Sequence, residues 1–273
     1  MMVMVGPALA GILVATTGYG WTYSIDVVLM LAMFLGLWTL PPLRPEGTIV
    51  RPGLESLVDG WRFLKRAGNI RTQYILDIIA MTFGNPIALY PALGTVLLGG
   101  GAITTGTLTA AVAAGTFLSS LFSGRVVRYR WHGLGIQRAI QVYGASILAF
   151  GAVLLLGVWM PPVSENTVNL GLIIAACVAL AVSGASDNIS SIYRSTMMQA
   201  SVPDSIRGRL QGIFIIVVTG GPRLGALYVG ALSTLTALWF PPLIGGFIVI
   251  ALVAFAVRLT PRFRSYDAEN PTP

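Results

Sequence analysis

Charged residues are scarce in this chain. Only 10% of its 273 residues are Asp, Glu, Lys or Arg, whereas 55% are hydrophobic. A water-soluble globule of this length needs more polar surface than such a composition can supply. The scarcity of charge therefore excludes a soluble protein and indicates an integral membrane protein.

Cysteine and histidine are almost absent, with one residue of each, Cys177 and His132. Single residues provide neither a disulfide framework nor a metal-ligand pattern, and no Ser, His or Cys cluster has the spacing of a nucleophilic site. The stretch GGGAITTG at 99–106 lacks the lysine of a phosphate-binding loop, so we assign it to an outer turn. We expect no enzyme, no cofactor and no metal, a packing role for Cys177 and a solvated His132.

The hydrophobic residues form eight stretches close to the roughly 20 residues that cross a bilayer as a helix. Gly, Ala and Pro are interspersed among Leu, Ile and Val, as in packed membrane helices, and no strand-like alternation is evident. The stretches are Met1–Thr17, Trp21–Leu40, Tyr74–Leu98, Ala102–Phe122, Ile140–Trp159, Val168–Ile189, Leu210–Leu232 and Leu238–Leu259. The sequence predicts an all-α polytopic membrane protein of about eight transmembrane helices.

Basic residues occupy every second connection between these stretches. Lys and Arg follow the second, fourth, sixth and eighth stretches, and the intervening connections contain neither. The positive-inside rule makes the basic side cytoplasmic, so we expect a multi-pass cell-membrane protein with both termini in the cytoplasm. The net charge of +7 thus reflects membrane topology, and the expected partner is the lipid bilayer rather than nucleic acid.

The longest polar interruption, 41–72, separates two stretches from the other six. Leu54, Leu57, Val58 and Trp61 follow helical spacing there, with basic residues close by, which predicts an amphipathic helix at the cytoplasmic surface. We favour a connector between two bundles over a regulatory or lipid-sensing helix. The expected divisions are a two-helix remnant of an N-terminal bundle at 1–40, the linker at 41–72, a six-helix bundle at 73–260 and a cytoplasmic tail at 261–273.

The first and last pairs of stretches look like copies of each other. Each begins with a glycine–proline helix, continues through a turn without basic residues into a second apolar helix, and ends in a proline–arginine segment. Parallel repeats of this kind occur in secondary transporters, and relative to such a plan four helices are expected to be missing from the front of the chain. The shared motif, whose glycines permit close helix packing, is Gly6, Pro7 and Gly11 in the first pair and Gly221, Pro222 and Gly225 in the last.

Three segments carry a resemblance to a known family: GPALAG at 6–11, ILDIIAMTFGNPIALYPAL at 75–93 and SIYRSTMMQASVPDSIRGRLQGIFIIVVTGGPRLG at 191–225. Together they resemble the enterobactin-exporter-like branch of the major facilitator superfamily, whose relatives include macrolide and multidrug efflux proteins. The resemblance implies family helices five to twelve and hence a partial major-facilitator fold. Ala226 stands where close relatives often have an acidic residue, so this position offers Arg223 no charge partner.

Ionisable and amide side chains inside the apolar stretches are the candidate pathway residues. Asp77 precedes Asn85 and two prolines, which are expected to kink its helix; it can serve transport or a structural hydrogen bond. Asp187 and Asn188 begin a polar stretch in which 187, 191 and 194 share a face, suited to line a pathway or to dock on another helix. Helical rise places Asp77 and Asp187 at similar depths.

Arg223 is the charge in the least favourable place. It lies past the midplane of its stretch, where burying an arginine costs about 2.5 to 3.5 kcal/mol. We therefore expect it to meet an acid, backbone carbonyls or an anionic cargo. A static ion pair that locks the outer half is favoured over substrate binding, with Asp187 as a candidate partner.

The pattern and the resemblance together predict a secondary active transporter. It would export an amphipathic small molecule, such as a siderophore or a drug, by alternating access, with protons carried by Asp77 or Asp187. Two alternatives stay open. One is a transport-incompetent fragment, because one bundle would have only two helices, and the other is a membrane permease subunit of a larger complex.

Overall fold

A computed structural model describes residues 2–39, 54–161, 163 and 167–272. The chain divides into two compact units, Met1–Arg51 and Pro52–Pro273, and each is described by itself. The described residues contain helices and connections but no strand, so the predicted all-α class is confirmed.

Seven helical segments of the described part are long and apolar enough to cross a membrane. They are Gly20–Trp38, Gly68–Val96, Gly101–Ser120, His132–Val158, Leu170–Ser201, Ile206–Leu235 and Phe240–Leu259. Each coincides with one of the predicted stretches, and the remaining stretch, Met1–Thr17, lies outside the residues for which spans are described. The chain is therefore a polytopic membrane protein.

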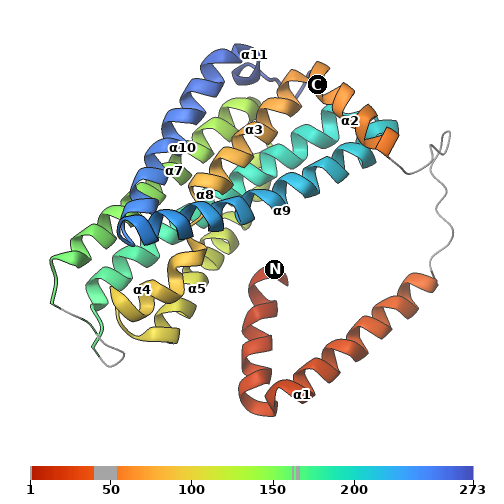
Figure 1. Ribbon diagram of the computed structural model, residues 1–273. Helices are drawn as coiled ribbons and strands as arrows, with labels where there is room; N and C mark the ends of the chain where they lie inside the picture. Colours follow the sequence, from red (N-terminus) through yellow and green to blue (C-terminus); the bar gives the residue numbers. More distant parts are fainter. Residues whose placement is uncertain (1, 40–53, 162, 164–166, 273) are drawn as a thin grey trace. The chain divides into compact units, whose positions relative to one another are not determined.

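The described part of the first unit is a single helix, α1 (Met2–Trp38). The sequence predicts a turn at Gly18–Gly20, but the chain stays helical there, and α1 instead bends sharply between its two halves (Figure 1). From Gly20 onward almost every side chain is exposed within this unit. The motif residues Gly6, Pro7 and Gly11 lie in the earlier half, whose side chains are outside the described ones.

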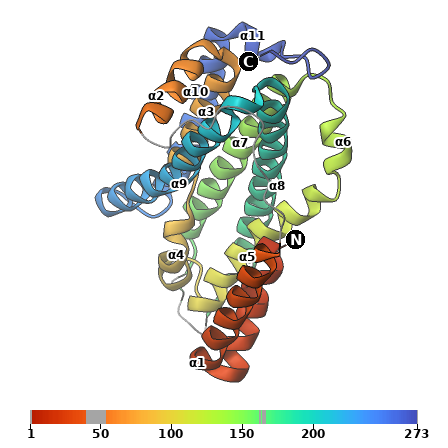
Figure 2. The same ribbon diagram turned by 90° about the vertical axis from the view of Figure 1, so that its right-hand side faces the viewer.

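The second unit is a bundle of long helices with short elements at their ends. The long helices pack in the order α5, α8, α7, α10, α3 and α9, each against the next (Figures 1 and 2). The elements are α2 (Leu54–Arg66), α3 (Gly68–Phe83), the 3₁₀ turn η1 (Ile87–Leu89), α4 (Tyr90–Val96), α5 (Gly101–Ser120), α6 (Ser123–Val127), α7 (His132–Val158), α8 (Leu170–Ser201), α9 (Asp204–Leu235), α10 (Phe240–Leu259) and α11 (Pro261–Arg264).

Local chemistry sets several of these boundaries. Asn169 begins α8 as its N-cap, because its side-chain oxygen accepts the free N–H of Leu172 at 3.4 Å. α10 carries a proline in its first turn, where a missing N–H costs nothing. Gly99 and Gly100 adopt φ values of 78° and 76°, which only glycine tolerates well, so the outer turn is tight and α5 begins at Gly101. Most of the turn expected at 99–106 is therefore helix.

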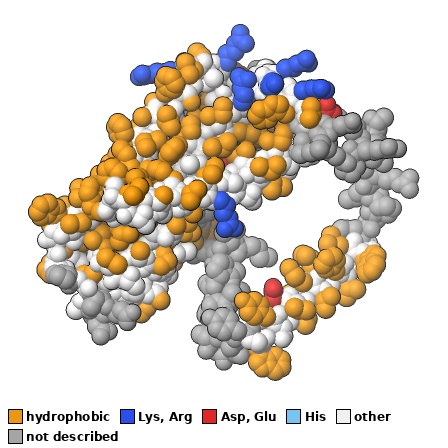
Figure 3. All heavy atoms as spheres, in the orientation of Figure 1, with side chains coloured by type: hydrophobic (Ala, Val, Ile, Leu, Met, Phe, Trp, Pro, Cys, Tyr) orange, Lys and Arg blue, Asp and Glu red, His pale blue; other side chains and the backbone are white. Residues whose placement is uncertain are grey.

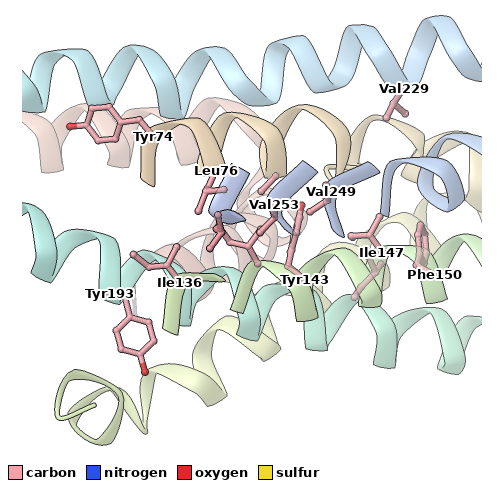
Figure 4. Close-up of a cluster of buried hydrophobic side chains, with 14 of the residues drawn as sticks. Tyr74, Leu76, Ile136, Tyr143, Ile147, Phe150, Tyr193, Val229, Val249 and Val253 are labelled. Atoms are coloured by element: carbon pink, nitrogen blue, oxygen red, sulfur yellow. The ribbon is translucent and has the colours of Figure 1, made fainter. Parts of the chain in front are cut away.

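A cluster of buried apolar side chains joins all six long helices of the second unit, and Figure 4 shows part of it. Lipid tails are as apolar as these side chains, so the helices associate through close packing rather than through the hydrophobic effect. Cys177 packs against this cluster, as expected. The labelled members are Tyr74 and Leu76 of α3, Ile136, Tyr143, Ile147 and Phe150 of α7, Tyr193 of α8, Val229 of α9, and Val249 and Val253 of α10.

The contact between α5 and α8 brings backbone against backbone. A Cβ atom on Gly115 would overlap the backbone of Ala181, and a Cβ atom on Gly184 would overlap the carbonyl of Val112. Small residues at membrane helix interfaces allow this close approach.

Replacing Gly115 by alanine should therefore separate α5 from α8. We expect Gly115→Ala to lower the free energy of unfolding in detergent by about 1 to 3 kcal/mol, as overpacking does. Gly106 of the same helix has no atom within 4 Å of an added Cβ, so Gly106→Ala should leave stability unchanged or raise it by up to about 1 kcal/mol through helix propensity. Thermal unfolding of the two variants checks this, and equal effects would contradict it.

The segment after α10 folds back onto the bundle. Tyr266 is buried, and its hydroxyl lies 2.7 Å from Ser201 Oγ of α8. The Asn69 side chain of α3 donates to the carbonyl of Thr272 at 3.0 Å, and the backbone carbonyl of Arg130 accepts the N–H of Ala268 at 3.0 Å. The sequence indicated a cytoplasmic tail here without indicating these contacts.

His132 is buried rather than solvated, so this expectation was wrong. Its ring centroid lies 5.1 Å from that of Tyr193 and 6.2 Å from that of Tyr266, and its Nε2 lies 3.3 Å from the Val127 carbonyl oxygen. The folded-back segment supplies one of the two rings that enclose it. The residues next to His132 in the sequence give no sign of this enclosure, because Tyr266 comes from the other end of the chain.

The folded-back segment should stay docked throughout the physiological pH range. Arg130 donates to both carboxylate oxygens of Asp267, at 2.9 and 2.6 Å, and this holds the pKa of that carboxyl well below its usual range. A lowered folded-state pKa means that the stabilisation is fully present above the ordinary value of about 4 and is lost only as the pH falls below it. Hydrogen exchange at the Ala268 amide, corrected for intrinsic rates, should be independent of pH between about 5 and 8 and faster in Asp267→Asn. Protection that already weakens between pH 6 and 5 would contradict this assignment.

Candidate functional site

α3 ends at Phe83 because the next residues cannot continue the helix. The carbonyl of Thr82 would accept the N–H of residue 86, but Pro86 has none. The last regular helical bond is the one that the N–H of Gly84 donates to the Ala80 carbonyl at 2.8 Å, and the chain resumes through η1 and α4. The expected kink is therefore a full break in the helix.

Neighbouring helices cover the backbone at this break. Tyr143 of α7 donates its hydroxyl to the carbonyl of Gly84 at 2.7 Å. A Cβ atom on Gly245 of α10 would overlap the carbonyl of Phe83. Asn85, a candidate pathway residue, uses its side-chain oxygen to accept the N–H of Ile87 at 3.2 Å. Backbone groups that proline frees within a membrane are thus satisfied or closely covered.

The glycine–proline motif of α9 lies against the same end of α3. A Cβ atom on Gly225 would lie 2.5 Å from the carbonyl oxygen of Met81, and one on Gly221 would lie 3.0 Å from the Met81 Cβ. Pro222 sits inside an α9 that remains continuous. The two glycines of the motif therefore allow α9 to pack closely against α3.

Arg194 of α8 lies between two carboxylates. It forms an ion pair with Asp77 of α3 through Nη1 and a second one with Asp187 of its own helix, with Nη2 at 3.5 Å from Oδ1. The side chains of Arg194 and Asp77 are 7% and 3% exposed, whereas Asp187 is 42% exposed. One cation thus links α3 to α8 inside the bundle, with one carboxylate buried and the other more open.

Arg194 is not among the candidate pathway residues that the sequence indicates, although it lies at the centre of this cluster. It was counted among the basic residues that follow the sixth stretch, but α8 continues to Ser201 and buries it. Two features of the sequence point to this contact. Residues 187, 191 and 194 share a helix face, and Asp77 and Asp187 are expected at similar depths in the membrane. Both acids indeed contact the same guanidinium.

Several buried polar atoms beside this cluster lack a hydrogen-bond partner within the described part of the chain. They are Gln73 Oε1, Asp77 Oδ2, Ser190 Oγ and Arg194 Nε. Gln73 lies one helical turn before Asp77, and Ser190 lies one turn before Arg194, so each pair shares a face of its helix. An unsatisfied buried polar atom costs about 1 to 3 kcal/mol, so the cluster has unused capacity for a proton, a water or a polar ligand group.

The remaining candidates lie apart from this cluster. Asn188 donates to Ser119 Oγ at 2.9 Å and to Ser120 Oγ at 3.1 Å, and so ties α8 to α5. Arg223 is exposed on α9 and forms no ion pair with the described residues. Asp187 is paired with Arg194, so the suggested pair of Asp187 and Arg223 is not formed. No group of three or more His, Cys, Asp or Glu in the described part could hold a metal.

Removing the cation should destabilise the bundle. Arg194→Met leaves Asp77 buried without a counter-charge, which typically costs about 3 to 5 kcal/mol in free energy of unfolding. The double variant Asp77→Asn with Arg194→Met removes both charges, so we expect it to recover part of this loss. Chemical unfolding in detergent measures both.

The exposed pair of Arg62 and Asp59, with N–O separation of 3.6 Å, supplies the matched control. Arg62→Gln should cost less than about 1 kcal/mol, as surface pairs do. A double variant no more stable than Arg194→Met would show that the unpaired carboxylate is not the origin of the loss.

Comparison with known proteins agrees with the resemblance seen in the sequence. A family model described as transmembrane secretion effector matches residues 1–273. The enterobactin exporter EntS of Citrobacter koseri is 27% identical over 272 residues, which cover 99% of this chain and 61% of that protein. The proteins of the same name from Shigella flexneri and Escherichia coli O139:H28 are 28% identical over 232 residues, covering 85% of this chain and 51% of each relative.

The chain therefore spans between 51% and 61% of the length of these curated relatives. No solved structure matches it significantly. The match to the whole chain decides its family: the protein belongs to the transmembrane secretion effector family of the major facilitator superfamily.

Proposed function

We propose that this chain forms part of a secondary active exporter that moves an amphipathic small molecule, such as a siderophore, across the cell membrane in exchange for protons. The observation that carries the proposal is the placement of Arg194 between Asp77 and Asp187. The name of the curated relatives, enterobactin exporter, supports a siderophore as the class of cargo.

The charge balance of the cluster suits it to bind and release one proton. With both carboxylates ionised, the two acids and one arginine carry a net charge of −1, which is costly inside a membrane protein. One proton makes the cluster neutral. Asp187, at 42% exposed, is the more open acid, and Asp77 has an oxygen without a partner in the described part of the chain. A proton on either acid leaves Arg194 bound mainly to the other.

A change of partner at Arg194 would loosen the link between two groups of helices. α3 packs mainly against α9 and α10, whereas α8 packs against α5 and α7. α3 and α8 touch each other over only a short stretch. The ion pair between Asp77 and Arg194 is therefore well placed to hold one arrangement of these helices until a proton weakens it, as alternating access requires.

Arg223 is suited to meet the cargo. Its side chain lies on the exposed side of α9, where Ile216 and Leu227 are 61% and 69% exposed. A cation beside apolar side chains matches an amphipathic anion. We place the arginine-rich end of the second unit in the cytoplasm by the positive-inside rule, and Figure 3 shows Lys and Arg side chains gathered at the end of this unit that holds α2 and α11.

Export driven by a pH gradient tests this function. Everted membrane vesicles from cells that produce the chain would be loaded with a proton gradient and given labelled enterobactin, the compound named for the relatives. Asp77→Asn and Asp187→Asn should each abolish the dependence of uptake on the gradient, because Arg194 with one remaining carboxylate is already neutral and has no charge to offset by taking up a proton.

Asp204→Asn is the control, since this acid is 87% exposed and pairs only with Arg207 in the described part. Unchanged coupling in both Asp77→Asn and Asp187→Asn would remove these acids from the mechanism. Absence of uptake even by the unaltered chain would favour the alternative that these helices do not transport by themselves.

A further inference from the structure

The arginine-rich end of the second unit carries a shallow pocket of about 600 Å³ between α7 and the end of α10. Its lining includes Trp131, Leu134, Arg258 and Arg264. None of its lining residues belongs to the break after α3 or to the cluster around Arg194. It is therefore a separate feature from the proposed transport site.

The two arginines of this pocket have no counter-charge among the residues that the structure describes. Neither Arg258 nor Arg264 forms an ion pair or a side-chain hydrogen bond with the described residues, and both are exposed. The nearest acids along the chain, Asp267 and Glu269, are both paired with Arg130, at 2.6 and 3.4 Å. The pocket thus presents two free guanidinium groups, which bind phosphate oxygens through their planar donors.

An aromatic side chain and an apolar surface adjoin these charges. Trp131 is 39% exposed, at the start of a predicted span, where indole rings favour the boundary between headgroups and hydrocarbon. Phe255 and Leu259, at 59% and 67% exposed, share a face of α10 at i, i+4 spacing, and Phe255 lies one turn before Arg258. Val142, at 48% exposed, lies about two turns along α7 from Leu134, beyond the exposed Arg138. The charged pocket therefore opens onto a surface suited to acyl chains.

We propose that this pocket binds the headgroup of an anionic phospholipid. Arg258 and Arg264 contact the phosphodiester, the indole N–H of Trp131 donates at the level of the glycerol, and the acyl chains lie along Phe255, Leu259 and Val142. Basic pockets at the cytoplasmic ends of membrane helices bind lipid headgroups in this way. A free inorganic anion would gain nothing from the apolar surface, so the continuity of charge and apolar side chains favours the lipid.

Native mass spectrometry of the detergent-purified full chain tests the proposal. The probe is phosphatidylglycerol, compared with phosphatidylcholine of the same acyl chains and with inorganic phosphate. We expect the unaltered chain to retain phosphatidylglycerol selectively and to gain thermal stability from it. Arg258→Gln with Arg264→Gln should weaken this binding at least about tenfold, because each basic residue near an anionic lipid contributes appreciably.

Arg262→Gln is the matched control, since this exposed residue belongs to the same short helix α11 but does not line the pocket. It should bind phosphatidylglycerol like the unaltered chain, and Arg258→Lys with Arg264→Lys should retain most of the binding. The single variants Arg258→Gln and Arg264→Gln repeat the comparison with one charge removed. Each is used only if its thermal unfolding without lipid matches that of the unaltered chain.

Three results would overturn the proposal: equal retention of phosphatidylcholine, equal stabilisation by inorganic phosphate, or equal binding by the glutamine variants and the unaltered chain. None of these readouts depends on transport. The lipid site and the proposed export function can therefore fail independently.

Discussion

A charge that cannot reach water must find its partner inside the protein, and in the second unit this constraint joins α3 to α8. Arg194 lies deep in the bundle and contacts Asp77 across the helix interface and Asp187 along its own helix. Hydrocarbon offers neither side chain an alternative partner, so separating them is expensive. The relative position of α3 and α8 is therefore fixed at the depth of this contact.

The backbone near the ion pair is subject to the same lack of water. About two and a half helical turns after Asp77, Pro86 prevents α3 from continuing and frees backbone carbonyls, which also need cover. Tyr143 supplies a hydroxyl, and glycines on α9 and α10 bring their helices close against the exposed peptide groups. The ion pair and the glycine contacts thus lie along one helix, α3.

The sequence revealed those features that depend on neighbouring residues along the chain. Composition and helical length located the spans, and Pro86 located the break in α3. The rise of a helix also placed Asp77 and Asp187 at similar depths, which the shared contact with Arg194 bears out. The family resemblance, carried by long motifs around these same residues, was correct.

Features that depend on contacts between distant segments were not accessible in this way. The sequence places Arg194 at the cytoplasmic end of its span, because a positive charge usually lies there, whereas α8 continues to Ser201 and Arg194 is buried against Asp77. His132 looked solvated because the ring that covers it, Tyr266, comes from the far end of the chain. The ion pair that we favour for Arg223 over contact with the cargo is not formed with the described residues, and its side chain lies exposed on α9.

The lengths of α8 and α9 determine which parts of these helices reach water. Each has 32 residues, which corresponds to about 48 Å at 1.5 Å per residue, against roughly 30 Å for the hydrocarbon layer. Even at a tilt of about 40° such a helix is longer than the hydrocarbon layer is thick, so the ends of both helices extend into the headgroup region or the water. Labels at these ends, at Gln199 or in the first turn of α9, should therefore be accessible to water-soluble reagents.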